Sequence, residues 1–287
     1  MSLPLSHHGP SFFVSHGTGP FPLLGGDEQR PFLDTLKRNR HVIEGVKAII
    51  LFSAHWETDE PHISGGTKPG LYYDYEAQRK MLPPAAFEFQ YDAPGDPNLA
   101  RVIATELAKH GFKPQIDYER GFDHAVYVPM TVLRPEADIP IVQMSILKST
   151  TEREATERNL ALGQAMRCFR DDGYAILGSG GSYHDFNAIA GAFFKLPSDP
   201  RATVQLDTGA YEFEDWLADQ ASISDVSQRC EALARWRNVL DSWIAHTEGS
   251  SDHLMPFMVT AGAGGESKGR RIDYCEVVGA PMGFYLW

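Results

Sequence analysis

Apolar and polar positions along the chain follow two alternating patterns, one typical of buried strands and one typical of helices. The clearest strand is residues 48–52, an unbroken apolar run that predicts a strand buried on both faces. Shorter apolar runs predict further strands at residues 11–14, 139–147 and 174–177. Helical spacing lies between them, at residues 32–40, 98–109 and 155–170. This alternation predicts an α/β fold with three layers (αβα) around a central sheet that is mostly parallel or mixed.

The remaining segments extend this pattern. Residues 205–246 are predicted to form two or three helices, and residues 272–278 and 283–287 one or two final strands. The connection 65–97 is rich in Gly, Pro and Tyr, and so long a connection usually carries function, such as a pocket wall or a lid. No linker composition divides the chain, so we expect a flexible tail at residues 1–10 and a single domain at residues 11–287.

Composition narrows the class of protein. The chain has 287 residues, 43% of them hydrophobic and 22% charged, which is the profile of a soluble globular protein. Its formal charge of −12 argues against a nucleic acid or an anionic membrane as partner. Three cysteines without a C-x-x-C spacing indicate reduced thiols, and no signal peptide or membrane span is expected. We therefore expect a cytoplasmic protein that is a monomer or a small homo-oligomer.

Four of the eleven histidines share a position relative to the predicted elements. His16, His55 and His184 each follow the end of a predicted strand, and His253 begins a predicted helix. Parallel strands place their carboxyl ends at one rim, so these side chains are expected to meet whatever their separation in sequence. Neutral imidazoles that meet at one point suit a divalent transition metal. The sequence therefore predicts a metal site at the carboxyl ends of the strands.

The glycine-rich stretch 178–181 has a competing interpretation as a phosphate-binding loop. No Lys or Arg follows it, and the G-x-G-x-x-G spacing is absent. We therefore interpret its glycines as allowing a tight turn that brings His184 into a pocket.

Five motifs together carry a resemblance to a known family. In chain order they are Ser15-His16-Gly17, Ser53-Ala54-His55-Trp56-Glu57, Gly121-Phe122-Asp123-His124, Gly178-Ser179-Gly180-Gly181-Ser182-Tyr183-His184 and Asp252-His253-Leu254-Met255-Pro256. With these motifs the chain resembles the class III (LigB-like) extradiol ring-cleavage dioxygenases, and within them the DOPA 4,5-extradiol dioxygenase branch. The matches follow the family's order and span residues 11–263.

This resemblance implies an enzyme with a mononuclear non-haem metal centre that opens a catechol-type aromatic diol beside its two hydroxyls, using O2. It implies His16, His55 and His253 as metal ligands, the last at a position where the related protocatechuate-cleaving enzymes have a glutamate. Fe(II) is the metal expected for activity. Three neutral histidines also suit Zn(II), so zinc is the alternative occupant.

The resemblance also implies roles for two further histidines. His184 matches the family's active-site acid/base, which takes a proton from the diol and returns it, and the alternative is that His184 is a fourth metal ligand in the resting state. His124 matches the second pocket histidine and is expected to hydrogen-bond a diol hydroxyl or oxygen. Its neighbour Asp123 is the candidate to orient the His124 ring.

Two functions from other classes compete with the dioxygenase. One is a zinc-dependent hydrolase that uses metal hydroxide as nucleophile with His184 as base. The other is a metal-binding homologue without catalysis. The sequence does not choose between possible catechols.

Overall fold

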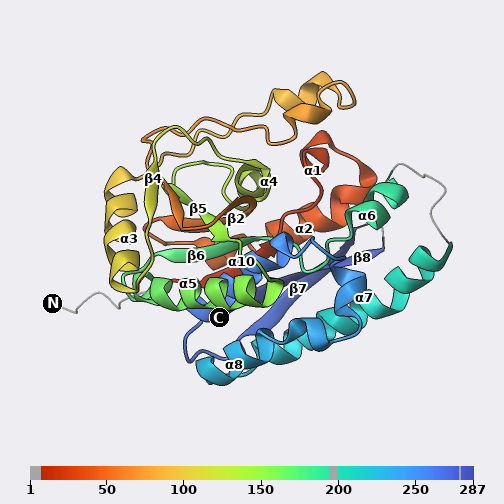
Figure 1. Ribbon diagram of the computed structural model, residues 1–287. Coiled ribbons are helices and arrows are strands. Elements are labelled where there is room, and N and C mark those ends of the chain that lie inside the picture. The colour runs from red at the N-terminus through yellow and green to blue at the C-terminus, as the bar shows by residue number, and fades with distance from the viewer. Residues whose placement is uncertain (1–7, 194–199, 278) are drawn as a thin grey trace.

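A mixed eight-stranded sheet forms the centre of the computed structural model, which describes residues 8–193, 200–277 and 279–287 (Figure 1). The order of the strands across the sheet is β4-β3-β5-β2-β6-β1-β8-β7. Their bounds are β1 Ser11–Ser15, β2 Ile49–Thr58, β3 His62–Ser64, β4 Gln115–Asp117, β5 Ile141–Leu147, β6 Ala175–Gly180, β7 Arg270–Val277 and β8 Ala280–Leu286. The central strands β5, β2, β6 and β1 are parallel, whereas β8 joins β1 and β3 joins β5 in antiparallel orientation. The predicted mixed α/β sheet is confirmed.

Helices cover both faces of this sheet (Figure 1). The helices are α1 Phe21–Leu24, α2 Arg30–Arg38, α3 Pro97–Lys109, α4 His124–Leu133, α5 Glu152–Asp171, α6 Phe186–Phe193, α7 Pro200–Ala221, α8 Val226–Leu233, α9 Ser242–Ala245 and α10 Met255–Ala263. The short 3-10 turns are η1 Asp27–Gln29, η2 Arg40–Ile43, η3 Glu76–Gln78, η4 Pro84–Phe87, η5 Trp236–Asn238 and η6 Asp252–Leu254. Helices α2 and α4 lie on one face, and α5 and α10 lie on the other. The predicted three layers are thereby confirmed.

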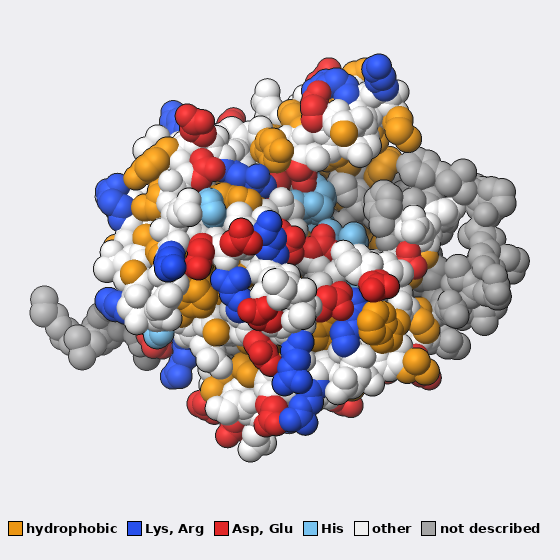
Figure 2. Space-filling view, viewed as in Figure 1, with side chains coloured by type: hydrophobic (Ala, Val, Ile, Leu, Met, Phe, Trp, Pro, Cys, Tyr) orange, Lys and Arg blue, Asp and Glu red, His pale blue; other side chains and the backbone are white. Residues whose placement is uncertain are grey.

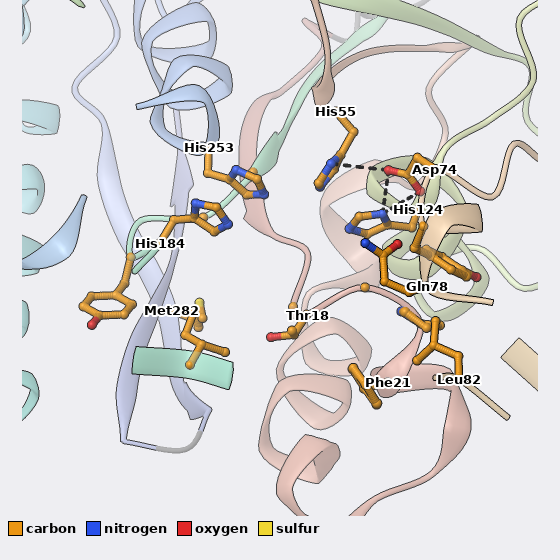
Figure 3. Close-up of a pocket in the computed structure, with 18 of the residues that line it drawn as sticks. Thr18, Phe21, His55, Asp74, Gln78, Leu82, His124, His184, His253 and Met282 are labelled. Atoms are coloured by element: carbon orange, nitrogen blue, oxygen red, sulfur yellow. Dashed lines mark hydrogen bonds and ion pairs between the residues drawn. The ribbon is translucent and has the colours of Figure 1, made fainter. Parts of the chain in front are cut away.

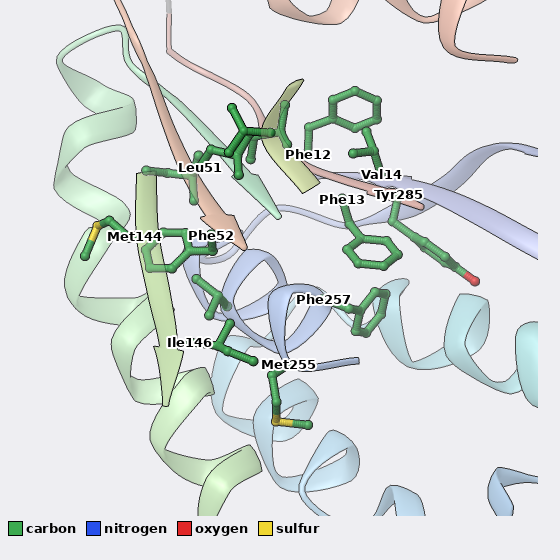
Figure 4. Packing of buried hydrophobic residues seen from close by; sticks show 14 of the residues in the cluster. Phe12, Phe13, Val14, Leu51, Phe52, Met144, Ile146, Met255, Phe257 and Tyr285 are labelled. Atoms are coloured by element: carbon green, nitrogen blue, oxygen red, sulfur yellow. The ribbon is translucent and has the colours of Figure 1, made fainter. Parts of the chain in front are cut away.

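The core lies between the central strands and α10. The residues of β1, β5 and β6 are all buried, as expected for parallel strands covered on both faces. Phe13 of β1 packs edge-on against Phe257 of α10, with ring centroids 5.4 Å apart, and Tyr285 of β8 contacts both rings (Figure 4). This packing fixes α10, and with it the turn η6 that precedes the helix, against the sheet.

Two glycines bring α10 unusually close to α5. A Cβ on Gly163 of α5 would lie 2.0 Å from the Val259 carbonyl oxygen, and one on Gly262 of α10 would lie 2.2 Å from the Leu160 carbonyl oxygen. No other residue fits either position without moving a backbone. Helix α5 begins at Glu152, where the Thr151 side chain accepts the Glu154 N–H as an N-cap.

Two predicted strand ends were wrong. β6 runs on through the glycine-rich stretch to Gly180 instead of breaking at Gly178, and β2 includes His55. The pairing of β2 with β5 shifts register between Ser53 and Glu57, so three extra residues of β2 leave the ladder. Such a bulge cannot be recognised from an apolar run.

Part of the predicted N-terminal tail is attached to the domain. The Gly9 N–H donates to the Arg170 carbonyl oxygen at 2.7 Å, and Pro10 accepts from Ile176 N–H at 2.9 Å. Residues 1–7 lie outside the described residues, so the boundary between tail and domain stays a prediction. Among the described residues, no helix combines the length and the apolar character needed to cross a membrane.

Candidate metal centre

The structure brings together all five histidines that the sequence singles out. His16 follows β1 directly, His55 lies in the bulge of β2, and His124 is the first residue of α4. His184 lies between β6 and α6, and His253 lies in η6. Four of them, His55, His124, His184 and His253, line one end of a cavity of about 320 Å³ (Figure 3). His16 lies against this group, with its ring centroid 5.1 Å from those of His55, His124 and His253, and the five residues together are here called the histidine end. His16, His55 and His184 reach this rim from parallel strands, as the sequence predicts, whereas His124 and His253 come from α4 and η6.

Three of the rings form a nearly equilateral triangle. The ring centroids of His16 and His55 are 5.1 Å apart, those of His16 and His253 5.1 Å, and those of His55 and His253 4.8 Å. His124 lies against the same group, with its ring centroid 3.8 Å from that of His55 and 5.1 Å from that of His16. One nitrogen each from His16, His55 and His124 lie within 4.8 Å of one another.

Two imidazole nitrogens from different rings of this cluster lie close together. His16 Nε2 and His55 Nε2 lie 3.2 Å apart. Two imidazole ligands on one tetrahedral zinc, with bonds of about 2.0–2.1 Å, would place their nitrogens roughly 3.3 Å apart. Two facing lone pairs repel unless a cation or a proton lies beside them. The donor set and its spacing therefore fit a single transition-metal ion.

Polar oxygen atoms lie beside the Nδ1 atoms of His16 and His253, on the side away from the centre of the cluster. The Ser179 hydroxyl donates to the Ala125 carbonyl oxygen, so His16 Nδ1–H donates to Ser179 Oγ at 3.2 Å. His253 Nδ1 lies 3.1 Å from a carboxylate oxygen of Asp252, without the geometry of a hydrogen bond. A hydrogen on Nδ1 leaves the Nε2 lone pair free, which is the tautomer that a metal-binding histidine requires.

Asp74 is a candidate site residue that the sequence did not predict. Its carboxylate accepts from His124 Nδ1 at 2.8 Å and lies 3.3 Å from His55 Nδ1, so one side chain contacts two rings (Figure 3). It lies in the connection 65–97, which the sequence predicts to be a pocket wall. The Tyr72-Tyr73-Asp74-Tyr75 run within this connection was the only available signal.

Asp123 does not orient His124, and that hypothesis was wrong. Its buried carboxylate accepts from the hydroxyl of Ser53, from Arg120 and from the Gln143 amide. It also accepts the Ala125 N–H as the N-cap of α4. An N-cap side chain turns back toward the first amides of its own helix, so it cannot reach the ring of the next residue. Asp123 instead ties β2, β5 and α4 together beneath the site.

Glycines of β6 place His253. A Cβ on Gly180 would lie 2.1 Å from the His253 carbonyl oxygen, and one on Gly178 would lie 2.4 Å from that of Pro256. The Gly181 N–H donates to the same His253 carbonyl at 2.9 Å. Gly178 and Gly180 therefore let the backbone of η6 and α10 approach the strand, and the tight turn predicted at these glycines was wrong, because β6 runs through them. The predicted position of His184 in a pocket is confirmed.

His184 lies beside His253 with fewer constraints. The two rings stack with centroids 3.4 Å apart and an angle of 6° between their planes. The backbone of His184 is held, since its N–H donates to the Ala245 carbonyl oxygen and its carbonyl accepts from the Ser250 hydroxyl. Its Nδ1 is buried without a hydrogen-bond partner and lies 3.9 Å from Asp252 Oδ1.

The electrostatics divide the histidines into two groups. Burial lowers the pKa of His16, His55 and His253 well below the ordinary value, and repulsion from the neighbouring rings adds to this. Burial also lowers the pKa of His184. For His124, burial disfavours the charged ring, but the Asp74 carboxylate outweighs it and raises the pKa. Neutral rings are the form that binds a metal.

The other end of the cavity is mostly apolar, although the polar side chains of Thr18 and Gln78 also line the cavity (Figure 3). We call it the apolar end, and its side chains come from α1, the connection 65–97, α6 and β8: Phe21, Met81, Leu82, Ile189 and Met282. Figure 3 shows Phe21, Leu82 and Met282 across the cavity from His55 and His124. Histidine side chains are visible from outside on this face, with acidic side chains beside them (Figure 2).

Comparison with known proteins defines the class. Residues 5–281 match the family model described as the catalytic LigB subunit of aromatic ring-opening dioxygenase. Because this match covers nearly the whole chain, the protein belongs to that family and is an extradiol, aromatic ring-opening dioxygenase. The resemblance predicted from the five motifs is confirmed.

Individual relatives indicate which branch of the family the chain is similar to. The chain is 34% identical to dioxygenase tasH of Hapsidospora irregularis, with 97% of this chain and 85% of the relative covered. It is 34% identical to the 4,5-DOPA dioxygenase extradiol of Portulaca grandiflora, with 92% and 89% covered. The crystal structure of an uncharacterized protein from Escherichia coli K12 superposes with a TM-score of 0.71 at 21% identity, covering 97% of this chain and 99% of that one. This last likeness supports the fold alone.

Proposed function

We propose that this protein opens a catechol-type aromatic diol, DOPA-like or related, with O2 at a single non-haem metal ion held by histidines. The observation that carries the proposal is the triangle of His16, His55 and His253, with ring centroids 4.8 to 5.1 Å apart. The relatives from Portulaca grandiflora and Beta vulgaris, named 4,5-DOPA dioxygenase extradiol, support an aromatic diol as substrate. We further propose a cytoplasmic enzyme that acts as a monomer or a small homo-oligomer, without a nucleic-acid or membrane partner.

His16, His55 and His253 would hold the metal. Fe(II) is the ion we propose for turnover and Zn(II) an ion that the same three imidazoles would also bind. A bound Fe(II) ion would supply the redox chemistry through which O2 reacts with an electron-rich ring. The set His16, His55 and His124 is the competing assignment, because one nitrogen from each of these three rings lies within 4.8 Å of the others. We prefer His253, because its ring completes the triangle with those of His16 and His55.

His184 would move the proton. A diol hydroxyl must lose a proton before its oxygen can bind as an anion, and a proton must be returned as the ring opens. Burial lowers the pKa of His184 and so favours the neutral ring. In the tautomer with its hydrogen on Nδ1, the Nε2 lone pair of His184 would be free to accept that proton. The same residue could serve as a fourth ligand in the resting state.

His124 would orient the diol. Its Nδ1 is held by Asp74 at 2.8 Å, so its Nε2 is directed away from that carboxylate. A charged or neutral His124 held this way can make one hydrogen bond to a diol oxygen. The stacked pair His184 and His253 lies on the other side of the cluster (Figure 3).

The test is anaerobic loading with Fe(II), followed by O2 and a panel of substituted catechols. We expect O2 consumption at one mole per mole of diol and a yellow ring-opened product. Cleavage of esters or amides by the zinc form, with no O2 consumed by the iron form, would establish the hydrolase instead. Metal binding with neither activity would establish the non-catalytic homologue.

Two variants test the roles of the histidines. His184→Ala should retain about one metal ion per chain and lose turnover, whereas loss of the metal would make His184 a fourth ligand. His124→Ala should also retain the metal. If His124→Ala lost the metal while His253→Ala retained it, the competing ligand set of His16, His55 and His124 would be favoured.

A further inference from the structure

The cavity of the candidate site is larger than the ring that would react in it. Its volume is about 320 Å³, whereas an apolar cavity of roughly 150 Å³ already accommodates a benzene ring. If the diol oxygens face the histidine end, the opposite side of the ring faces the apolar end (Figure 3). The cavity therefore has room for a substituent on the ring, and the apolar end surrounds that room.

The apolar end is assembled from parts of the chain that are distant in sequence. Phe21 comes from α1, Met81 and Leu82 follow η3, Ile189 lies in α6, and Met282 lies in β8. Ile189 and Met282 are buried, and Leu82 is half-buried. Aliphatic and aromatic groups from four segments converge here. Each methylene of a substituent that they remove from water contributes about 0.8 kcal/mol to binding.

The charge of the cavity acts against an anionic substituent. Apart from histidines, Asp74 is the only charged side chain among the described residues that line it. A carboxylate on the substrate would leave water for a wall without Lys or Arg, where uncharged side chains such as those of Thr18 and Gln78 replace only part of its hydration. The formal charge of the chain, −12, would also disfavour the approach of an anion.

From these observations we infer that, among the catechol-type diols proposed above, the preferred substrate is one related to DOPA in which an uncharged, apolar substituent, such as a short alkyl or aryl group, takes the place of the amino-acid side chain. The substituent packs against Phe21, Leu82 and Met282. This inference rests on the proposed function, since it assumes that a diol occupies the histidine end.

The first test uses two catechols of similar shape. In 4-(3-methylbutyl)catechol an isopropyl group replaces the carboxylate of 3-(3,4-dihydroxyphenyl)propionate. Dissociation constants are measured by anaerobic calorimetry on the Fe(II)-loaded protein, where no turnover occurs, and kcat/KM is then measured with O2. We expect the alkyl compound to bind at least tenfold more tightly than the carboxylate, and affinity to rise about fourfold for each methylene from 4-methyl- to 4-butylcatechol. Equal or tighter binding of the carboxylate or of L-DOPA would overturn the inference.

The second test moves a charge into the apolar end. Leu82→Arg places a cation at a half-buried position, where an arginine can be accommodated. We expect it to shift the ratio of the two dissociation constants at least tenfold toward the carboxylate. The matched control is Leu240→Arg, at a residue that is 80% exposed and does not line the cavity, and it should leave the ratio unchanged. An unchanged ratio in Leu82→Arg would show that the substituent does not lie there.

These measurements separate the inference from the proposed function. Unsubstituted catechol is the reference in both. If catechols bind with the expected preference but no O2 is consumed, the dioxygenase proposal fails while the inference about the cavity holds. If catechol is cleaved and the carboxylate is preferred, the inference alone fails.

Discussion

The histidine end of the cavity is attached to the central sheet, whereas the apolar end is carried mostly by the connections around it. His16 and His55 are on or next to β1 and β2, and the backbone of His253 is hydrogen-bonded to the end of β6. At the apolar end, Met282 alone belongs to a strand, and Met81 is 81% exposed on the connection 65–97. Chemistry common to a family requires fixed ligand positions, whereas loops can vary without disturbing them. The difference suggests that the two ends can be altered separately.

Removing a ligand at the histidine end should have the largest effect. We expect His16→Ala and His55→Ala to reduce bound metal from about one ion per chain to nearly none, and to lower kcat/KM by more than about 10³-fold. Metal content by elemental analysis and O2 uptake are the measurements. His62→Ala is the control, because His62 lies on β3 next to Trp56 and does not line the cavity. Full metal content in both ligand variants would contradict the assignment.

The close approach of η6 to the sheet offers the next largest effect. The added Cβ of Gly180→Ala would lie 2.1 Å from the His253 carbonyl oxygen, so η6 must move. We expect the free energy of unfolding to fall by about 3 kcal/mol and metal affinity to fall with it. Urea denaturation measures the first and a metal-binding titration the second.

The control for this variant lies in the connection 65–97. A Cβ on Gly70 would have no atom within 4 Å, and its φ is not positive. Gly70→Ala should therefore change stability by less than about 0.5 kcal/mol. Equal destabilisation by the two variants would remove the distinction between the sheet-attached end and the connections.

The sequence predicts the histidine end well because that end follows from topology. A histidine after a parallel strand reaches the common rim whatever the distances between side chains, and so His16, His55 and His184 could be grouped without coordinates. Asp74 could not, because its position depends on the path of a connection of some thirty residues without hydrophobic periodicity. Asp123 was misassigned because it is next to His124 in sequence, although its side chain caps α4 instead. The bulge in β2 and the close approach of η6 to β6 at Gly180 depend on backbone contacts, which a pattern of hydrophobic and polar residues does not predict.

Asp74 is the point at which the connection 65–97 reaches the histidine end. Asp74→Ala removes the carboxylate that contacts the Nδ1 atoms of His55 and His124. We expect metal affinity and kcat each to fall 10- to 100-fold, as for other groups that orient a metal-binding histidine. Asp74→Asn, which keeps an oxygen acceptor, should recover part of the loss.

The comparison for Asp74 is Asp92→Ala in the same connection. Asp92 is exposed and does not line the cavity, so metal affinity should be unchanged. Normal metal affinity in Asp74→Ala would mean that the sheet alone positions the ligands, and the separation between the two ends would then be complete.

The smallest effect is expected where the connection 65–97 is fixed beside the cavity. The Tyr75 hydroxyl donates to the Ala86 carbonyl oxygen at 2.6 Å and lies 2.5 Å from the Tyr127 hydroxyl. Tyr75→Phe leaves both groups buried without that partner, which should lower the free energy of unfolding by about 1–2 kcal/mol. Since Met81 and Leu82 belong to the same connection, KM should rise more for a 4-alkylcatechol than for catechol, while metal content stays at about one ion per chain.

Tyr72→Phe is the control for Tyr75→Phe, because the Tyr72 ring is 48% exposed and keeps its contact with Arg120. An equal rise in KM for both diols would show that this connection supports the histidine end as much as the apolar end. Only a rise in KM that is confined to the 4-alkylcatechol would show that the connection contacts the substituent and so determines substrate specificity.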